Sequence, residues 1–311
     1  MTETRVFAIP LRTRFRGITV REGMLLRGEA GWGEFSPFLE YDAPTARPWL
    51  VAALEAAAGD WPAPLRHEIP GNVTVPACEP ERARQIVLAS NGCRTAKVKV
   101  AEPGQSVAQD EARLEAVRDA LGADGLVRVD ANGGWSVDEA VANIPLLDRA
   151  AGGLEYVEQP VATVEDLALV RRRVDVPIAA DESIRRAEDP YRVRDLAAAD
   201  IAVLKVQPLG GVRACLRIAE DIGLPVVVSS ALETSVGIAA GVALAAALPE
   251  LRHACGLATV QLLAGDVTDD PLLPVGGMLP VRRPEVSASL LERWAGAPAR
   301  VEHWVTRLQR L

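Results

Sequence analysis

Short runs of apolar and β-branched residues recur along most of the chain at nearly even intervals. Their starts lie 23 to 30 residues apart, which leaves room for a helix in every gap. Two of the intervening segments, 106–121 and 136–150, begin with a serine that suits a helix N-cap. The runs are 72–77, 95–100, 125–132, 154–160, 177–183, 201–208, 225–232 and 253–259.

Eight strand-and-helix units of similar length predict an α/β fold, a (β/α)8 TIM-like barrel. A doubly wound open sheet shares this alternation, but no glycine-rich fingerprint follows the first run. The pattern therefore favours a closed barrel over residues 69–274. In such barrels the active site lies at the carboxyl ends of the strands.

The two ends of the chain have a different pattern. Polar and apolar positions alternate over 15–28 and 31–38, which predicts an antiparallel hairpin, and 44–59 predicts a helix. In the tail, 290–296 and 301–311 read as amphipathic helices. We expect residues 1–68 to form a smaller α+β capping domain to which 275–311 contribute, with Trp294 and Trp304 as core anchors.

Composition narrows the class of function. The formal charge of −8 argues against a nucleic-acid or anionic-membrane surface, and favours a small-molecule substrate. We find no secretory signal, and the longest apolar stretch falls short of the ~20 residues that span a bilayer, so we expect a cytoplasmic protein. The four cysteines are scattered without a C-x-x-C pair, which predicts neither a zinc site nor a disulfide framework. Either a monomer or a small homo-oligomer is compatible with this sequence.

Charged residues stand at the ends of five consecutive predicted strands. They are Lys97 and Lys99, then Asp130, Glu158, Asp181 and Lys205. Three carboxylates that meet in a partly desolvated barrel mouth repel one another unless a cation lies between them. An all-oxygen ligand set favours Mg²⁺, with Mn²⁺ as second choice. The competing interpretation is that each carboxylate caps a helix or pairs with Arg128 or a lysine.

The lysines suggest chemistry beside the metal. Lys99 and Lys205 come from strands on opposite sides of the barrel mouth, so they can face a bound ligand from two sides. Lys97 lies farther from the strand end than Lys99. We therefore expect its charge to tune the basicity of Lys99 and to help position the substrate, rather than to accept a proton. A salt bridge to a triad carboxylate is the alternative, more for Lys97 than for the other two. A metal with a lysine base indicates proton abstraction next to a carboxylate.

Taken together, these motifs resemble the muconate-lactonizing branch of the enolase superfamily, and within it the o-succinylbenzoate synthases of menaquinone biosynthesis. The matching pieces are AKVKV (96–100), RVDANGGW (128–135), EYVEQP (155–160), AADES (179–183), LKVQPLGG (204–211) and, in the capping segment, GWGEFSPF (31–38). The resemblance spans nearly the whole chain, and the ordered set is more specific than any single motif.

The resemblance implies a reaction and a role for each matched residue. The reaction is dehydration of 2-succinyl-6-hydroxy-2,4-cyclohexadiene-1-carboxylate to o-succinylbenzoate. Asp130, Glu158 and Asp181 would bind Mg²⁺, Lys99 would be the base and then the acid, and Lys205 would stabilise the enediolate electrostatically. Arg128 and Glu182 would support the ligands from behind, and Asn132 would help to orient them.

Substrate binding is expected from the flexible parts. Arg16 and Gly17, with Phe35, Phe38 and Tyr41, would form a lid that excludes water. Gly210 and Gly211, with Ser229 and Ser230, would offer donors to the distal succinyl carboxylate. The glycine pair is equally what a tight turn requires.

Alternatives remain open on the same scaffold. A racemase or epimerase of N-acylamino acids or dipeptides would use Lys99 and Lys205 on opposite faces. That branch commonly has an arginine three positions after the second lysine, where this chain has Pro208. Muconate cycloisomerase suits a less compact N-terminal portion. A non-catalytic metal-binding barrel is a further alternative, whereas the three histidines, His67, His253 and His303, have no nucleophile context for a hydrolase.

Overall fold

The computed structural model describes residues 3–185 and 190–311. Seven parallel strands form one curved sheet in the order β11-β10-β9-β8-β7-β6-β5, so strands that follow one another in the chain are hydrogen-bonded neighbours. The strands are β5 (Asn72–Val75), β6 (Thr95–Lys99), β7 (Leu126–Asp130), β8 (Leu154–Glu158), β9 (Ile178–Ala180), β10 (Ile201–Lys205) and β11 (Val226–Ser229).

The eighth run does not form an extended strand, and that prediction is wrong in detail. Two residues of the run join the edges of the sheet through isolated parallel bridges, Cys255 to Gly71 and Gly256 to Ser229. The amide of Asn72 also donates to the Cys255 carbonyl at 2.9 Å. Since this short segment is bonded to both edges of the sheet, the predicted barrel architecture is confirmed, with an eighth strand reduced to two bridged residues.

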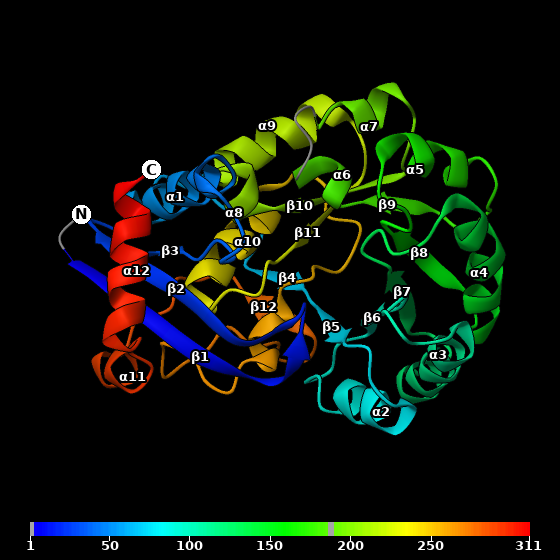
Figure 1. Ribbon diagram of the computed structural model, residues 1–311, viewed down its shortest axis with the longest axis horizontal. Helices are drawn as coiled ribbons and strands as arrows, with labels where there is room; N and C mark the ends of the chain where they lie inside the picture. Colours follow the sequence, from blue (N-terminus) through cyan, green and yellow to red (C-terminus); the bar gives the residue numbers. More distant parts are fainter. Residues whose placement is uncertain (1–2, 186–189) are drawn as a thin grey trace.

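Helices cover the outside of the curved sheet (Figure 1). The longer ones are α2 (Pro80–Leu88), α3 (Val107–Leu121), α4 (Val137–Ala150), α5 (Val164–Arg171), α9 (Val212–Ile222) and α10 (Ser235–Ala247). Shorter turns are α6 (Glu182–Arg185), α7 (Arg192–Asp195), α8 (Val206–Leu209) and the 3₁₀ helix η1 (Ala258–Leu262). As predicted, Ser106 and Ser136 are N-caps, and each forms a capping box.

Alternation along β6 separates the two sides of the barrel wall. Ala96 and Val98 are buried in the large apolar cluster that also contains Leu114 of α3. Lys97 and Lys99 point the other way, because successive side chains of a strand alternate between faces. The lysines therefore face the barrel interior and its mouth rather than bulk solvent.

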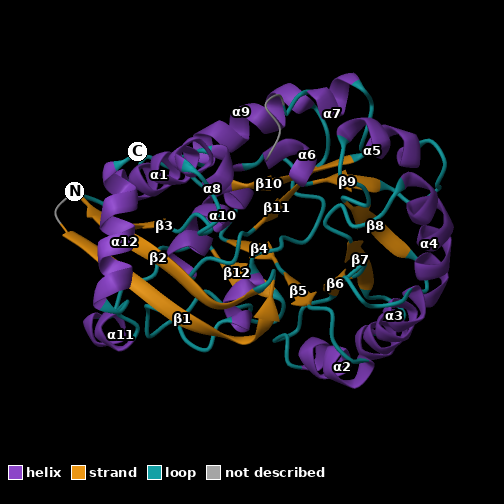
Figure 2. Cartoon of the chain, in the orientation of Figure 1, coloured by secondary structure: helices purple, strands orange, loops and turns teal. Residues whose placement is uncertain are grey.

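A second sheet, antiparallel, stands beside the barrel (Figure 2). It contains β1 (Glu3–Phe15), β2 (Ile18–Gly28) and β3 (Gly31–Phe35) in that order, and α1 (Ala43–Ala58) packs on it. At Gly33 the helix comes so close that an added Cβ would lie 1.9 Å from the Ala53 carbonyl oxygen, which explains the glycine. The strand β1 was not predicted, because its Pro10 and its arginines obscure the alternation. Proline is tolerated there since β1 is an edge strand.

The C-terminal tail returns to the N-terminal segment. It contains β12 (Met278–Pro280), which pairs with β4 (Glu68–Pro70), and the predicted helices α11 (Ala288–Arg293) and α12 (Pro298–Gln309). Trp304 is fully buried and meets the Phe35 ring edge-on at 5.8 Å, so its role as a core anchor is confirmed. Trp294 is only half-buried. Figure 1 shows α12 lying across β1 and β2.

None of the helices within residues 3–185 and 190–311 combines the length and the apolar character that crossing a membrane requires.

Candidate active site

The strand register brings the predicted charged residues to one level of the barrel. Lys99 pairs in register with Asp130, and Asp130 pairs with Glu158 on the next strand. Asp181 follows β9 directly, and Lys205 ends β10. The three carboxylate residues are at most 1 % exposed, so their charges interact in a medium that screens them poorly.

Lys97, Lys99 and Lys205 line a cavity of about 660 Å³ between the barrel mouth and the hairpin formed by β1 and β2, and the three carboxylates lie behind them. From the barrel come Thr74, Pro76, Ala77, Lys97, Lys99, Glu102, Gln105, Asn132, Glu182, Arg185, Lys205, Ser229, Ser230, Ala231, Leu232, Gly256 and Thr259. From the capping segment come Thr13, Arg14, Phe15, Arg16, Gly17 and Phe38. The cavity is large enough for a small organic acid.

All three lysines form ion pairs with the carboxylates. Lys97 Nζ lies 3.1 Å from both Glu158 carboxylate oxygens and 3.2 Å from Asp130 Oδ2. Lys99 Nζ lies 2.5 Å from Asp130 Oδ2, and Lys205 Nζ lies 2.6 Å from Asp181 Oδ2. The salt bridge that we gave as the alternative, more for Lys97 than for the other two, is thus present at all three lysines. Glu158 and Asp130 compensate the charge of Lys97, which weakens it as the tuning charge that we expected.

Burial and charge pull the pKa values of these groups apart. Burial alone would raise the pKa of Asp130, but Lys99 and Lys97 hold it well below its usual range. Burial likewise opposes ionisation of Asp181, yet Arg185 and Lys205 lower its pKa. Glu158 behaves in the opposite way: burial and then the charge of Asp130 raise its pKa to about 7. For Lys97, burial lowers the pKa, but Glu158 and Asp130 outweigh it and the net pKa is raised.

The carboxylates fit a hard divalent cation by their chemistry. Within the described residues no group of three or more His, Cys, Asp or Glu side chains is already gathered around one point, because lysines separate the three acids. Two features nevertheless favour a cation. The pKa of Glu158 is raised partly by its acidic neighbours, and Glu182 Oε2 is buried without a hydrogen-bond partner among the described residues. Both indicate more buried negative charge than the protein itself pairs optimally.

Two amide side chains position the acids, and only one was predicted. Asn132 accepts a hydrogen bond from Lys99 Nζ at 2.6 Å through Oδ1 and donates to Glu182 at 3.2 Å. Its backbone amide donates to Asp130 Oδ1 at 3.0 Å. Gln159, which we missed, is fully buried, and its Oε1 accepts from the Asp181 amide at 3.0 Å. The EQP motif follows a strand end, and that position was the available signal.

Arg185 is the second residue that we missed. Its Nε donates to Asp181 Oδ1 at 2.8 Å, and a second nitrogen lies 2.5 Å from Glu182 Oε1. A third contact, at 3.5 Å, reaches the Tyr41 hydroxyl of the capping segment. Glu182 and Arg185 are three residues apart on α6, a spacing that places them on one helix face.

Arg128 does not support the carboxylate triad, which corrects our expectation. Its guanidinium is fully buried and lies 2.5 Å from Glu155 Oε2. It also donates to the Tyr156 hydroxyl at 2.8 Å and to the Ala254 carbonyl at 2.9 Å. Arg128 shares the inward face with Asp130 but lies one layer deeper. There its hydrogen bonds connect β7 to β8 and to the segment that contains Ala254.

The predicted lid residues divide into three groups. Arg16, Gly17 and Phe38 line the cavity, and Arg16 lies 3.7 Å over the Phe38 ring. Tyr41 lies behind them and accepts a 2.8 Å hydrogen bond from Arg16. Phe35 is buried in the core of the capping segment, so its assignment to the lid is wrong.

The Arg16–Gly17 pair forms the tip of the hairpin. Both have positive φ, 49° and 77°, and they separate the paired residues Phe15 and Ile18. This is the conformation that a two-residue type I′ turn requires. Phe15 itself, which we missed, places its ring 5.6 Å from Lys99 Nζ.

The two predicted donor pairs have different outcomes. Ser229 and Ser230 line the cavity. Gly210 and Gly211 do not, which corrects that prediction: they have φ of 88° and 117° and lie against α1. An added Cβ on Gly211 would lie 2.5 Å from the Glu55 carboxylate, so the turn interpretation explains this pair.

Comparison with known proteins agrees with this geometry. Two family models match, the enolase C-terminal domain-like family over residues 80–285 and the enolase N-terminal domain-like family over 6–57. The chain is 69 % identical to the o-succinylbenzoate synthase of Thermobifida fusca, over 98 % of this chain and 94 % of that protein. The chain belongs to the o-succinylbenzoate synthase family of the enolase superfamily.

Another member of that family, the o-succinylbenzoate synthase of Mycolicibacterium smegmatis, is 57 % identical over 97 % of this chain and 93 % of its own. Membership makes the chain an enzyme of the carbon–oxygen lyase class. Among solved structures, muconate lactonizing enzyme from Pseudomonas putida shares the fold, with a TM-score of 0.79 at 21 % identity over 94 % of this chain and 98 % of that one. The L-Ala-D/L-Glu epimerase of Bacillus subtilis has a TM-score of 0.76 at 25 % identity, over 91 % and 96 %.

Proposed function

We propose that this enzyme dehydrates 2-succinyl-6-hydroxy-2,4-cyclohexadiene-1-carboxylate to o-succinylbenzoate in menaquinone biosynthesis, with Mg²⁺ as its cofactor. The observation that carries the proposal is the 69 % identity to an o-succinylbenzoate synthase over nearly the whole chain. The pair of lysines at opposite ends of a buried carboxylate row supports it chemically.

Asp130, Glu158 and Asp181 would hold the divalent cation. Mg²⁺ is the first choice for three carboxylates, and Mn²⁺ is the second. When bound, such a cation would supply positive charge to a substrate carboxylate and so make the neighbouring C–H bond more acidic.

Lys99 carries the proton transfers in this proposal. Its amine takes the proton from the carbon next to the ring carboxylate, and the electron pair of that C–H bond forms the new ring double bond. The C–O bond to the hydroxyl breaks, and the ammonium of Lys99 returns the proton, so water departs. Asn132, 2.6 Å from Lys99 Nζ, supports the role by orienting the amine.

Lys205 does not move a proton in this reaction. Its ammonium would stabilise the negative charge that develops on the substrate, partly by lying over the ring as a cation over a π system. Burial supports the role, since Lys205 is 7 % exposed and its charge acts at low effective dielectric.

The rest of the substrate has charged and polar partners. The hairpin tip at Arg16 and Gly17, with Phe38, would exclude water, and the hydroxyls of Ser229 and Ser230 would bind the distal carboxylate. Ser230 Oγ already lies 2.7 Å from Thr259 Oγ1, which fixes its orientation.

A second candidate function, racemisation or epimerisation of N-acylamino acids or dipeptides, has one specific observation in its favour. The fold is shared with an epimerase at 25 % identity, and two lysines face the site as two-base racemisation requires. Pro208 stands where an arginine is common in that branch, which favours dehydration as the main reaction.

Metal removal separates an enzyme from a passive metal-binding barrel. The purified chain, treated with EDTA and assayed with the cyclohexadiene substrate, should lose formation of the aromatic product. Added Mg²⁺ should restore it. Turnover that persists at full rate after chelation would refute the metal-dependent mechanism.

A further inference from the structure

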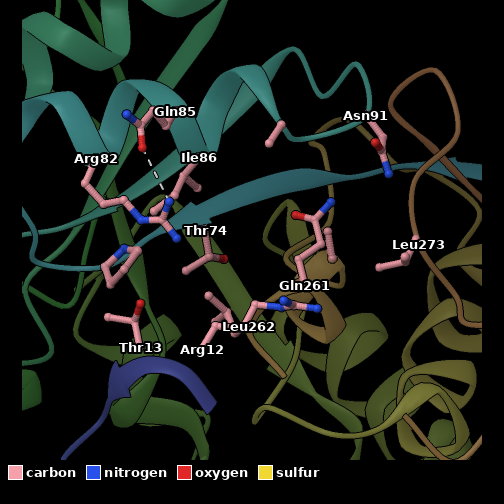
Figure 3. Close-up of a pocket in the computed structure, with 13 residues that line it drawn as sticks. Arg12, Thr13, Thr74, Arg82, Gln85, Ile86, Asn91, Gln261, Leu262 and Leu273 are labelled. Atoms are coloured by element: carbon pink, nitrogen blue, oxygen red, sulfur yellow. Dashed lines mark hydrogen bonds between the residues drawn. The ribbon is translucent and has the colours of Figure 1, made fainter. Parts of the chain in front are cut away.

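A second cavity lies beside the catalytic one, and neither the reaction nor the family motifs account for it. Its volume is about 340 Å³, and its wall is made by β1, β5, α2 and η1 together with nearby loops (Figure 3). The lining residues are Arg12, Thr13, Thr74, Pro76, Arg82, Gln85, Ile86, Ala89, Asn91, Ala258, Gln261, Leu262 and Leu273. These residues include two arginines and no acidic side chain.

The two guanidinium groups lack an acidic partner. Among the residues that the structure describes, Arg12 has no hydrogen bond or ion pair, and Arg82 has one 3.5 Å contact, with the neutral Gln85. Both arginines are exposed to solvent, so an ion can reach them. Figure 3 shows Arg82 and Arg12 extending into the cavity from opposite walls. The cavity therefore has two positively charged groups in its wall and no acidic side chain to compensate them.

A third donor in the wall is buried and unused. Gln261 Nε2 is inaccessible to solvent and has no hydrogen-bond partner in residues 3–185 and 190–311. An amide N–H that is buried without an acceptor costs free energy, so such a group calls for a ligand or an ordered water. If the Gln261 side chain rotates to turn this N–H toward the cavity, the amide would join the two guanidinium groups as a donor, a set that suits an anion with several oxygens.

We propose that this cavity binds a small oxyanion, a phosphate or a dicarboxylate, which links Arg12 of the capping sheet to Arg82 of the barrel. The link has a structural consequence. Arg12 precedes the hairpin tip by four residues, and Thr13, Thr74 and Pro76 line both cavities. A bound anion therefore holds the hairpin, whose tip walls the catalytic cavity, against the barrel.

Calorimetric titration of the full chain with Mg²⁺ tests the binding. Inorganic phosphate and succinate are titrated separately into wild type, Arg12→Gln, Arg82→Gln and the control Arg84→Gln, which alters an exposed arginine of the same helix outside the cavity. Wild type and Arg84→Gln should bind at least one of the two anions saturably. Each cavity variant should bind at least about tenfold more weakly, because a charge-assisted contact is lost. A preference for phosphate or for succinate identifies the ligand class.

Hydrogen exchange of the hairpin tests the consequence. The bound anion should slow amide exchange in residues 11–18 of wild type and leave the Arg82→Gln exchange unchanged. Since Arg82 lies outside the catalytic cavity, anion binding among the catalytic lysines would protect both proteins equally and so would contradict the proposal. Absence of saturable binding of both anions, or equal binding by all four proteins, would also overturn it. The outcome does not depend on which reaction the enzyme catalyses.

Discussion

Lys99 and Asp130 face each other across neighbouring strands, with Nζ 2.5 Å from Oδ2. In our proposal the same carboxylate binds a divalent cation and the same amine accepts a proton. The two roles are compatible, because a cation bound to Asp130 would take the place of Lys99 as the partner of this carboxylate and would free the amine for the substrate. This pair therefore connects cation binding to the availability of the base.

Replacing Lys99 by alanine should abolish most turnover and spare the metal site. Loss of a general base costs about 10²- to 10⁴-fold in rate. We expect kcat to fall by that range, with Mg²⁺ affinity maintained or improved, since Asp130 loses a competing cation. Steady-state kinetics and Mg²⁺ titration measure the two quantities. Normal activity in Lys99→Ala would refute the assignment of the base.

Arg185→Met should destabilise the protein mainly when no metal is bound. The substitution leaves Asp181 and Glu182 without their shared guanidinium partner, and breaking a buried ion pair costs about 3–5 kcal/mol. Urea unfolding with and without Mg²⁺ should show a loss that Mg²⁺ partly restores. Arg217→Met, on the exposed face of α9, is the matched control and should stay near wild type. A metal-independent loss would remove Arg185 from the cation site.

A buried carboxylate of the capping segment should give the stability a pH dependence. Burial, opposed by Arg21, raises the pKa of Glu34 from its ordinary value of 4.5 to about 7. The folded state then holds a proton that the unfolded state releases between these values. Its contribution to stability is therefore present at pH 4.5 and is lost as the pH rises to about 7.

Glu34→Gln should remove that dependence. Glu34 Oε2 accepts from the Thr234 and Gly237 amides at 3.0 and 3.1 Å, and a glutamine oxygen can do the same. The wild-type free energy of unfolding, measured relative to that of the variant, should decrease by roughly 2–3 kcal/mol between pH 4.5 and 7.5. Parallel pH profiles for the two proteins would mean that Glu34 does not titrate in this range.

Ser230→Ala should weaken substrate binding with little effect on the chemical step. If Ser230 binds the distal carboxylate equally in the ground and transition states, KM rises and kcat stays nearly constant. We expect about a tenfold increase in KM, from the loss of a hydrogen bond to a charged group. Ser289→Ala, at an exposed site in α11, provides the control. An unchanged KM in Ser230→Ala would place the distal carboxylate elsewhere.

The barrel and its ring of charges could be predicted because both follow from simple periods. Side chains alternate along a strand, so AKVKV had to place Lys97 and Lys99 on one face. Parallel strands in register had to bring Asp130 level with Glu158. The shortness of the eighth strand was not predicted, since two bridged residues, Cys255 and Gly256, are enough to close the barrel.

The remaining site residues depend on loop geometry that no period encodes. Gln159 and Arg185 act from the segment after a strand and from a four-residue helix, where side-chain direction follows from the local turn. The Gly210–Gly211 pair illustrates the converse. The sequence allowed either a turn or a binding loop, and the closeness of α1 decides for the turn. Arg128 shares its face with Asp130, but only the strand geometry reveals the deeper layer.

One assay tests the proposed reaction most directly. The pure enzyme with Mg²⁺ is incubated in deuterated water with the cyclohexadiene substrate and, separately, with N-succinyl amino acids. Our account predicts rapid formation of aromatic o-succinylbenzoate and no α-deuterium exchange in the amino acids. Rapid exchange without any aromatic product would contradict it and would identify the enzyme as a racemase.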